Sequence, residues 1–116
     1  EFEREVIKRE KVFPTALPTS GYKVALPHTD AEFVNKSVIA VASLRKPVMF
    51  NAMGNPEDVL PVNVVFLLAI KEKEKQVQVI GQLIEEVIKD EQLIERIVKS
   101  TTGEEIYDTI VEKLID

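Results

Sequence analysis

The sequence predicts a layered α/β domain in which a central β-sheet is flanked by helices. Apolar runs typical of strands lie in the first 70 residues, and amphipathic patterns with a helical period follow them. A chain of 116 residues suits one domain, residues 1–116. Hydrophobic residues make up 45% of the chain and aromatic residues only 6%, which indicates a core built mainly from Val, Ile, Leu and Ala.

The first part of the chain is predicted to alternate strands with loops. Residues 2–11 carry charged and apolar side chains at helical spacing, so they should form the exposed end of a helix. Two prolines, a glycine and three hydroxyls in residues 13–21 predict an irregular connection before a short strand at 22–26. Strands at 37–44 and 62–70 should form the centre of the sheet, the second of them covered on both faces.

The segment between these two central strands is predicted to be mostly loop. Residues 45–61 contain three prolines and one glycine, and these residue types usually interrupt strands. Only 48–50 is expected to add a short extra strand.

Three helices should complete the domain. Apolar residues recur at intervals of three and four from 77 to 88, again from 93 to 98, and again after Thr102. Asp90 is predicted to cap the second helix, and Thr102 with Glu105 has the spacing of a capping box for the third.

The composition excludes several classes of function. Twenty acidic residues against fifteen basic ones give a net charge of −5, which disfavours nucleic acid as a partner. The longest apolar run, 64–70, is far shorter than the roughly 20 residues of a membrane span, so no direct membrane insertion is expected. The absence of cysteine removes thiolate catalysis and cysteine-based metal sites. No signal segment is evident at the start, and a cytoplasmic location is predicted.

His28 is the strongest candidate for chemistry because it is the single histidine of the chain. It follows Leu26-Pro27 at a predicted strand end, where proline stops strand pairing and loops usually display reactive groups. The alternative is an ordinary packed or surface histidine. Asp30 could orient the imidazole, although capping of a turn is the favoured role for its carboxylate. No serine lies in a nucleophile-elbow motif, and His28 with Asp30 supplies too few ligands for a metal.

Two further segments have competing interpretations. Arg9 and Glu10 on a helix are by default a solvated ion pair. The threonine-containing segment 13–19 is either a connector or, if it folds back against His28, a source of hydroxyls for phosphate.

Two segments that follow one another along the chain carry a family resemblance. Residues 9–19 read Arg-Glu-Lys-Val-Phe-Pro-Thr-Ala-Leu-Pro-Thr, and residues 24–30 read Val-Ala-Leu-Pro-His-Thr-Asp. Together they resemble the enzyme IIA domain of the bacterial phosphoenolpyruvate:sugar phosphotransferase system, in its fructose-mannitol class (EIIA type 2). Residues 47–54, 62–70 and 76–80 are similar to that class in the same order. The Phe-Pro-Thr-x-Leu-Pro-Thr and Pro-His-Thr-Asp motifs look most like the galactitol-type branch.

The resemblance implies a phosphocarrier with a mixed β-sheet. His28 would accept a phosphoryl group on Nε2 from the phosphohistidine of the carrier protein HPr. A backbone carbonyl is expected to hold Nδ1–H, which leaves Nε2 as the nucleophile. It would then pass the group to a cognate IIB protein or domain, for use by the IIC permease on an incoming sugar. No cofactor or metal is implied. Similar modules in transcriptional regulators make a regulatory role the main alternative, and a noncatalytic scaffold is the third.

The resemblance also implies roles for other residues. Arg9 falls on the active-site arginine of the family, and a planar guanidinium suits phosphate oxygens. Thr15 and Thr29 could donate hydroxyl hydrogen bonds to phosphate. Gln76 stands where mannitol-type members carry a second histidine; it either donates its amide to phosphate or simply lies at a helix start.

Two expectations concern the surface. Family members usually begin with a further helix and strand, so the domain is expected to lack its N-terminal segment and to expose apolar surface there. The uncharged residues 25–27 are expected to form an apolar docking rim around His28.

Overall fold

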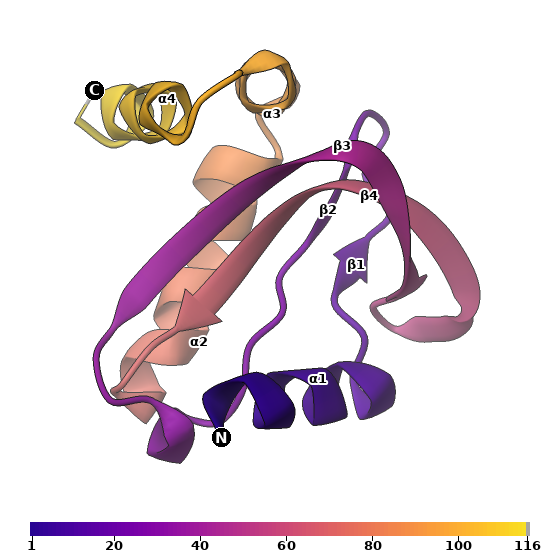
Figure 1. Cartoon of the computed structure of the whole chain (residues 1–116), viewed down its shortest axis with the longest axis vertical. Coiled ribbons are helices and arrows are strands. Elements are labelled where there is room, and N and C mark those ends of the chain that lie inside the picture. Colours follow the sequence, from indigo (N-terminus) through magenta and orange to yellow (C-terminus); the bar gives the residue numbers. More distant parts are fainter. Residues whose placement is uncertain (116) are drawn as a thin grey trace.

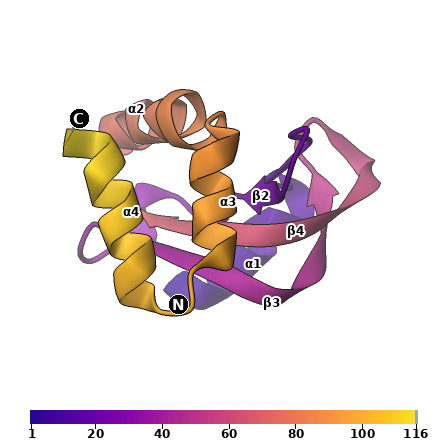
Figure 2. The ribbon, with the colours of Figure 1, turned by 90° about the horizontal axis from the view of Figure 1, so that it is seen from above.

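The computed structural model describes residues 1–115, with side chains through Lys113. A β-sheet separates two helical layers, and the predicted layered arrangement is confirmed (Figure 1). One helix, α1 (Phe2–Val12), lies against one face of the sheet. The other helices cover the opposite face, as the second view shows (Figure 2).

The sheet is mixed, as the family resemblance implied. Its strands are β1 (Ala16–Leu17), β2 (Lys23–Ala25), β3 (Val38–Ala52) and β4 (Asn55–Ala69), in the spatial order β1-β2-β4-β3. β4 pairs with β3 antiparallel and with β2 parallel. A bridge between Ala16 and Ala52 joins β1 to the end of β3, so the sheet closes on itself.

The prediction that residues 45–61 are mostly loop is wrong. β3 and β4 form one long hairpin whose turn contains Gly54, at a φ of 80°. Ladder pairs continue through the segment, for example from Phe50 to Leu60. Pro47 lies where the register shifts between Ser43 and Val48, a position that does not need a regular ladder donor. Prolines thus mark an irregularity here and do not end the strands. A second small difference is β1, which lies inside the predicted connection 13–21.

The central strand 62–70 is covered more completely on one face than on the other. Val64, Phe66 and Leu68 are fully buried beneath the C-terminal helices. Val65 and Leu67 point to the other face and are only half-buried. The expectation that this strand is covered on both faces is therefore only partly correct.

The C-terminal half contains the three predicted helical segments. They are α2 (Lys73–Gln82), continued by a π-helical turn at Leu83–Ile88, then α3 (Glu91–Lys99) and α4 (Gly103–Ile115). The Asp90 cap is confirmed, because Leu93 N–H donates to Asp90 Oδ1 over 3.1 Å. Thr102 accepts from Glu105 N–H at 3.2 Å, but the Glu105 carboxylate accepts from Thr101, so only half of the capping box forms. None of the helices within 1–115 has the length and apolar character needed to cross a membrane.

One hydrophobic cluster joins the sheet to these helices. It has the aliphatic composition predicted from the sequence, with Phe66 as its one aromatic member among the described residues. Its buried members are Val24, Leu26, Val64, Phe66, Leu68, Ile70, Leu83, Val87, Ile88, Leu93, Ile94, Ile97 and Ile106. Burial of this surface fixes β2 and β4 against the helices, and the residues that follow β2 are positioned with them.

Candidate functional site

His28 lies just beyond the end of β2 and is partly exposed. A parallel bridge to Leu68 of β4 holds its backbone, and Leu68 N–H donates to the Pro27 carbonyl at 3.0 Å. The Nδ1 atom of His28 is 2.7 Å from the Leu26 carbonyl oxygen. Because a carbonyl can only accept, Nδ1 carries the hydrogen and Nε2 keeps a lone pair in the neutral ring. The expectation that a backbone carbonyl would hold Nδ1–H is confirmed.

Arg9 comes from the last turn of α1 and reaches the same loop. Its Nη1 is 3.7 Å from Asp30 Oδ1, and its guanidinium carbon lies 5.1 Å from the centre of the Phe13 ring. The Arg9 side chain is 34% exposed, and its buried Nε has no hydrogen-bond partner among the described residues. The contact with Asp30 is too long for a hydrogen bond. The guanidinium therefore keeps donors that could bind an anion beside His28.

The predicted role of Asp30 needs correction. Asp30 begins a 3₁₀ turn (Ala31–Phe33), and its backbone carbonyl accepts from Phe33 N–H at 3.1 Å. Its carboxylate does not cap that turn but faces Arg9. The charge of Arg9 draws the carboxylate away from the backbone amides.

Thr15 is buried and supports the loop from inside. Its hydroxyl donates to Glu10 Oε1 at 2.8 Å and accepts from Leu26 N–H at 3.1 Å. Its backbone N–H donates to Glu10 Oε2 at 2.9 Å. Since the one hydroxyl hydrogen is already used, this arrangement does not support the predicted contact of Thr15 with phosphate.

Gln76 contacts Thr29, the residue that follows His28. Gln76, in α2, donates from Nε2 to the Thr29 carbonyl at 2.7 Å, and Thr29 is buried. The amide of Gln76 thus holds the backbone directly after His28, a role that neither interpretation of this residue anticipated. Contacts of Thr29 and Gln76 with phosphate stay predictions.

Glu10 is the residue of this site that the sequence analysis missed. It was interpreted as the partner of Arg9 in a solvated pair, but its carboxylate binds Thr15 and Arg9 faces Asp30. The signal available in the sequence was the Pro-Thr step just after the helix. That step brings the chain back toward the last turn of α1.

The predicted apolar docking rim at 25–27 is also wrong. Ala25 and Leu26 are fully buried and Pro27 is buried. These side chains pack inside the domain, so none of them can contact a partner. Exposed apolar side chains lie elsewhere, including Ile7 of α1 and Met49 of β3.

A groove of about 400 Å³ lies between α1 and the sheet, next to this loop. Its apolar lining includes Val6, Ile7, Met49, Val65 and Leu67. Charged or polar groups at the groove are few, so it does not have the lining of a phosphate or nucleotide site. No group of three or more potential metal ligands of the His, Cys, Asp or Glu type occurs within residues 1–115.

A family model matches this chain over residues 1–113 and describes the phosphoenolpyruvate-dependent sugar phosphotransferase system, EIIA 2. The chain belongs to this EIIA 2 family. The resemblance read from the two motifs is thereby confirmed at family level.

Relatives of this EIIA 2 chain include a component of a PTS system and a transcriptional regulator. It is 33% identical over 97% of its length to the 2-O-alpha-mannosyl-D-glycerate-specific EIIABC component of Escherichia coli K12, of which it covers 17%. It is 35% identical over 60% of its length to the transcriptional regulator ManR of Bacillus subtilis, of which it covers 9%. The chain therefore spans less than a fifth of either curated relative.

A solved structure shares the fold. The complex of enzyme IIA-mannitol and phosphorylated enzyme IIB-mannitol from Escherichia coli matches with a TM-score of 0.68 and 23% identity, over 96% of this chain and 73% of the other. At this identity the match establishes the fold alone. Mixed sheet and flanking helices are thus the architecture of an EIIA type 2 domain.

Proposed function

We propose that His28 is the phosphoryl-acceptor residue of this EIIA 2 domain. Its Nε2 would take the phosphoryl group from the phosphohistidine of HPr and pass it to a cognate IIB protein or domain, with a IIC permease downstream, in the cytoplasm. The observation that carries this proposal is the 2.7 Å contact between His28 Nδ1 and the Leu26 carbonyl. That contact leaves Nε2 as the nucleophilic nitrogen of the only histidine.

The transfer is a displacement at phosphorus between two imidazoles. The Nε2 lone pair of His28 forms the new P–N bond, and the P–N bond to the HPr histidine breaks with its electron pair returning to that ring. Positive charge then develops on the His28 ring, and the Leu26 carbonyl beside Nδ1–H stabilises it. Because the bonds broken and formed are alike, alignment and charge neutralisation are the main tasks of the protein.

Arg9 is proposed to neutralise the phosphoryl oxygens. Its guanidinium faces Asp30, two residues beyond His28, and makes no hydrogen bond within the described part of the chain. Exchange of the long Asp30 contact for a bidentate contact with phosphate would strengthen its interactions. The hydroxyl of Thr29 and the amide of Gln76 are the further candidates for phosphate contact.

The phosphorylation assay tests the acceptor directly. The chain is incubated with phosphoenolpyruvate, enzyme I and HPr, and wild type is compared with His28→Ala. An acid-labile, base-stable phosphate on wild type alone is expected. Labelling that persists in His28→Ala would reject His28, and no labelling of folded wild type would favour the scaffold alternative.

Arg9→Lys tests the second residue of the site. Lysine keeps the charge but not the planar donor pair, so the transfer rate should fall on the order of tenfold while the melting temperature stays the same. Stopped-flow or quench-flow transfer from phosphorylated HPr measures this rate. An unchanged rate would remove Arg9 from the site.

The identity of the sugar and the use of the phosphate form the finer part of the proposal. The Phe-Pro-Thr and Pro-His-Thr-Asp motifs support galactitol as the first sugar to test, with the mannosylglycerate relative as the comparison. The match to ManR supports the second candidate, a regulatory module controlled by His28 phosphorylation. Transfer of label from the phosphorylated chain to purified IIB proteins separates these uses, because a purely regulatory module would pass no phosphate to IIB.

A further inference from the structure

Glu10 occupies a position that the phosphoryl-transfer chemistry does not by itself explain. Both of its carboxylate oxygens are used by one residue: Oε2 accepts from Thr15 N–H at 2.9 Å, and Oε1 accepts from the Thr15 hydroxyl at 2.8 Å. Thr15 is only 3% exposed, so water cannot easily replace these partners. A carboxylate that accepts two hydrogen bonds from a buried residue is a strong anchor.

The hydrogen bonds continue from Thr15 to the imidazole. With its hydrogen donated to Glu10, the Thr15 hydroxyl presents a lone pair to Leu26 N–H, 3.1 Å away. The carbonyl of Leu26 then accepts from His28 Nδ1 at 2.7 Å. Regular pairing between β1 and β2 stops at Ala16 and Ala25, so the Thr15 hydroxyl takes the place of the next ladder acceptor.

We propose that Glu10 is a positioning residue for His28, acting through Thr15 and Leu26. By orienting the Thr15 hydroxyl, Glu10 fixes the backbone of Leu26, and the Leu26 carbonyl fixes the ring orientation and the hydrogen on Nδ1. The catalytic consequence rests on the proposed function of His28, whereas the effect on the ring does not.

The position of Glu10 on α1 gives this relay a second effect. Arg9 and Glu10 are consecutive residues in the last turn of the same helix, which ends as Phe13 N–H donates to the Arg9 carbonyl at 2.7 Å. Arg9 carries the guanidinium that faces Asp30, and Glu10 binds Thr15, the residue that supports the loop of His28. The Glu10–Thr15 contact therefore ties the last turn of α1, which carries Arg9, to the segment that supports the imidazole.

The ring itself provides the test, because the chain has a single histidine. Long-range ¹H–¹⁵N NMR spectra give the tautomer of the neutral ring in the unphosphorylated protein. Wild type is expected to show hydrogen on Nδ1. Glu10→Ala and Thr15→Val should move part of the population to hydrogen on Nε2, with a shift in the tautomer ratio of about fivefold, the equivalent of one hydrogen bond. Thr15→Ser keeps the hydroxyl and should retain the wild-type ratio.

A second measurement follows phosphorylation by the small donor phosphoramidate, which needs no protein partner. Glu10→Ala should slow modification of Nε2 and increase the share of product at Nδ1. The matched control is Glu3→Gln, which removes a charge from an exposed position of the same helix and should behave as wild type.

The outcomes separate the two proposals. A wild-type tautomer and wild-type Nε2 selectivity in folded Glu10→Ala would overturn the positioning role; should that variant fail to fold, the same result in Thr15→Val would overturn it. A shifted tautomer in a chain whose wild type accepts no phosphate from HPr would support the positioning role and reject the phosphocarrier. A shift in Glu3→Gln equal to that in Glu10→Ala would assign the effect to helix charge and overturn the relay.

Discussion

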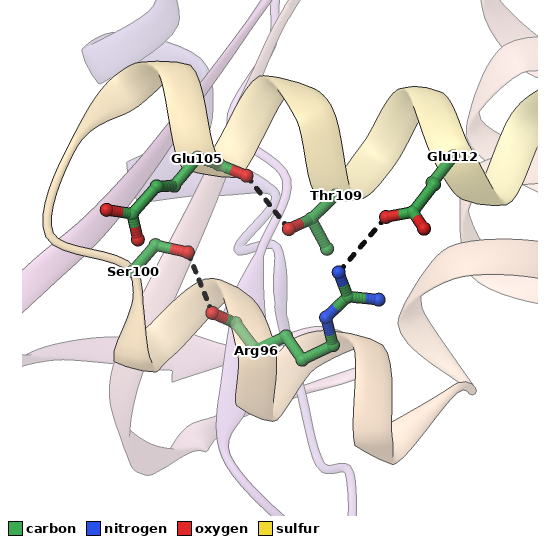
Figure 3. Close-up of polar contacts among 5 residues, drawn as sticks. All are labelled: Arg96, Ser100, Glu105, Thr109 and Glu112. Atoms are coloured by element: carbon green, nitrogen blue, oxygen red, sulfur yellow. Dashed lines mark hydrogen bonds and ion pairs between the residues drawn. The ribbon is translucent and has the colours of Figure 1, made fainter.

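The polar contacts around His28 differ in kind from those that join α3 to α4. Around His28, the buried hydroxyl of Thr15 connects Glu10 to Leu26. Between the two helices, Arg96 pairs with Glu112 at 3.1 Å, with side chains 58% and 66% exposed (Figure 3). The first set is buried or partly buried and the second is exposed to water, although each set connects separate elements of the fold.

This difference in burial determines how much each set of contacts contributes to the stability and geometry of the fold. A buried donor that loses its partner keeps the full cost of desolvation, whereas an exposed ion is readily hydrated again. The α3–α4 unit already has buried apolar side chains such as Leu93, Ile97 and Ile106. Its ion pairs are therefore additions to packing, while the His28 loop depends on its hydrogen bonds for geometry.

Removal of the Thr15 hydroxyl should produce the largest change in stability among the polar contacts. Thr15→Val keeps the shape but leaves Leu26 N–H and one oxygen of Glu10 without their partner. The free energy of unfolding should fall by about 1–3 kcal/mol, measured by urea denaturation. Thr19→Val is the control, because the Thr19 hydroxyl donates to Tyr22 O at an exposed site and should cost less. Equal losses of unfolding free energy in Thr15→Val and Thr19→Val would contradict the contrast between buried and exposed hydrogen bonds.

The sequence predicted the fold best where apolar residues recur with one helical period. The helical stripes after residue 77 and the Asp90 cap were found because local spacing encodes them. The β3–β4 hairpin was missed because its ladder pairs residues across the chain, and nonlocal pairing overrode the local signal of Pro47 and Pro56. A turn glycine such as Gly54 indicates a hairpin only once both flanking strands are recognised.

The site was predictable only in part for the same reason. His28 was singled out by its uniqueness and by the proline before it, and Arg9 by the family motif. The contacts of Glu10 and Gln76 required the fold, because they join α1 to the segment just before β1 and α2 to the loop that follows β2. Their side-chain types are also common on solvated helix faces, so composition provides no signal for them.

An effect of intermediate size on stability is expected from Asp90, and its dependence on pH tests the comparison further. The hydrogen bond from Leu93 N–H, and then the contact with Lys113, lower the pKa of Asp90 below its ordinary value of 3.8. A lowered folded pKa means that Asp90 stabilises the native state above that value, and this contribution disappears as the pH falls through the lower folded pKa.

Asp90→Ala should remove that contribution. The loss of the cap should cost about 1 kcal/mol near neutral pH, and the difference from wild type should shrink as the solution is acidified below the ordinary pKa. Denaturation at a series of pH values measures this convergence. A difference that stays constant down to strong acid would show that the cap does not act through the ionised carboxylate.

The smallest effect is expected from the exposed pair in Figure 3. Arg96→Gln removes the contact with Glu112 but keeps helix propensity and most of the side-chain stem, so stability should change by less than about 1 kcal/mol and the change should vanish in high salt. Glu112→Gln should give the same result, and the double variant should show little coupling energy. The His28 tautomer should not change in any of these variants, since neither α3 nor α4 contributes to the chain of hydrogen bonds from Glu10 to His28. A loss as large as that of Thr15→Val would mean that exposure does not decide the strength of these contacts, and the contrast between the two regions would fail.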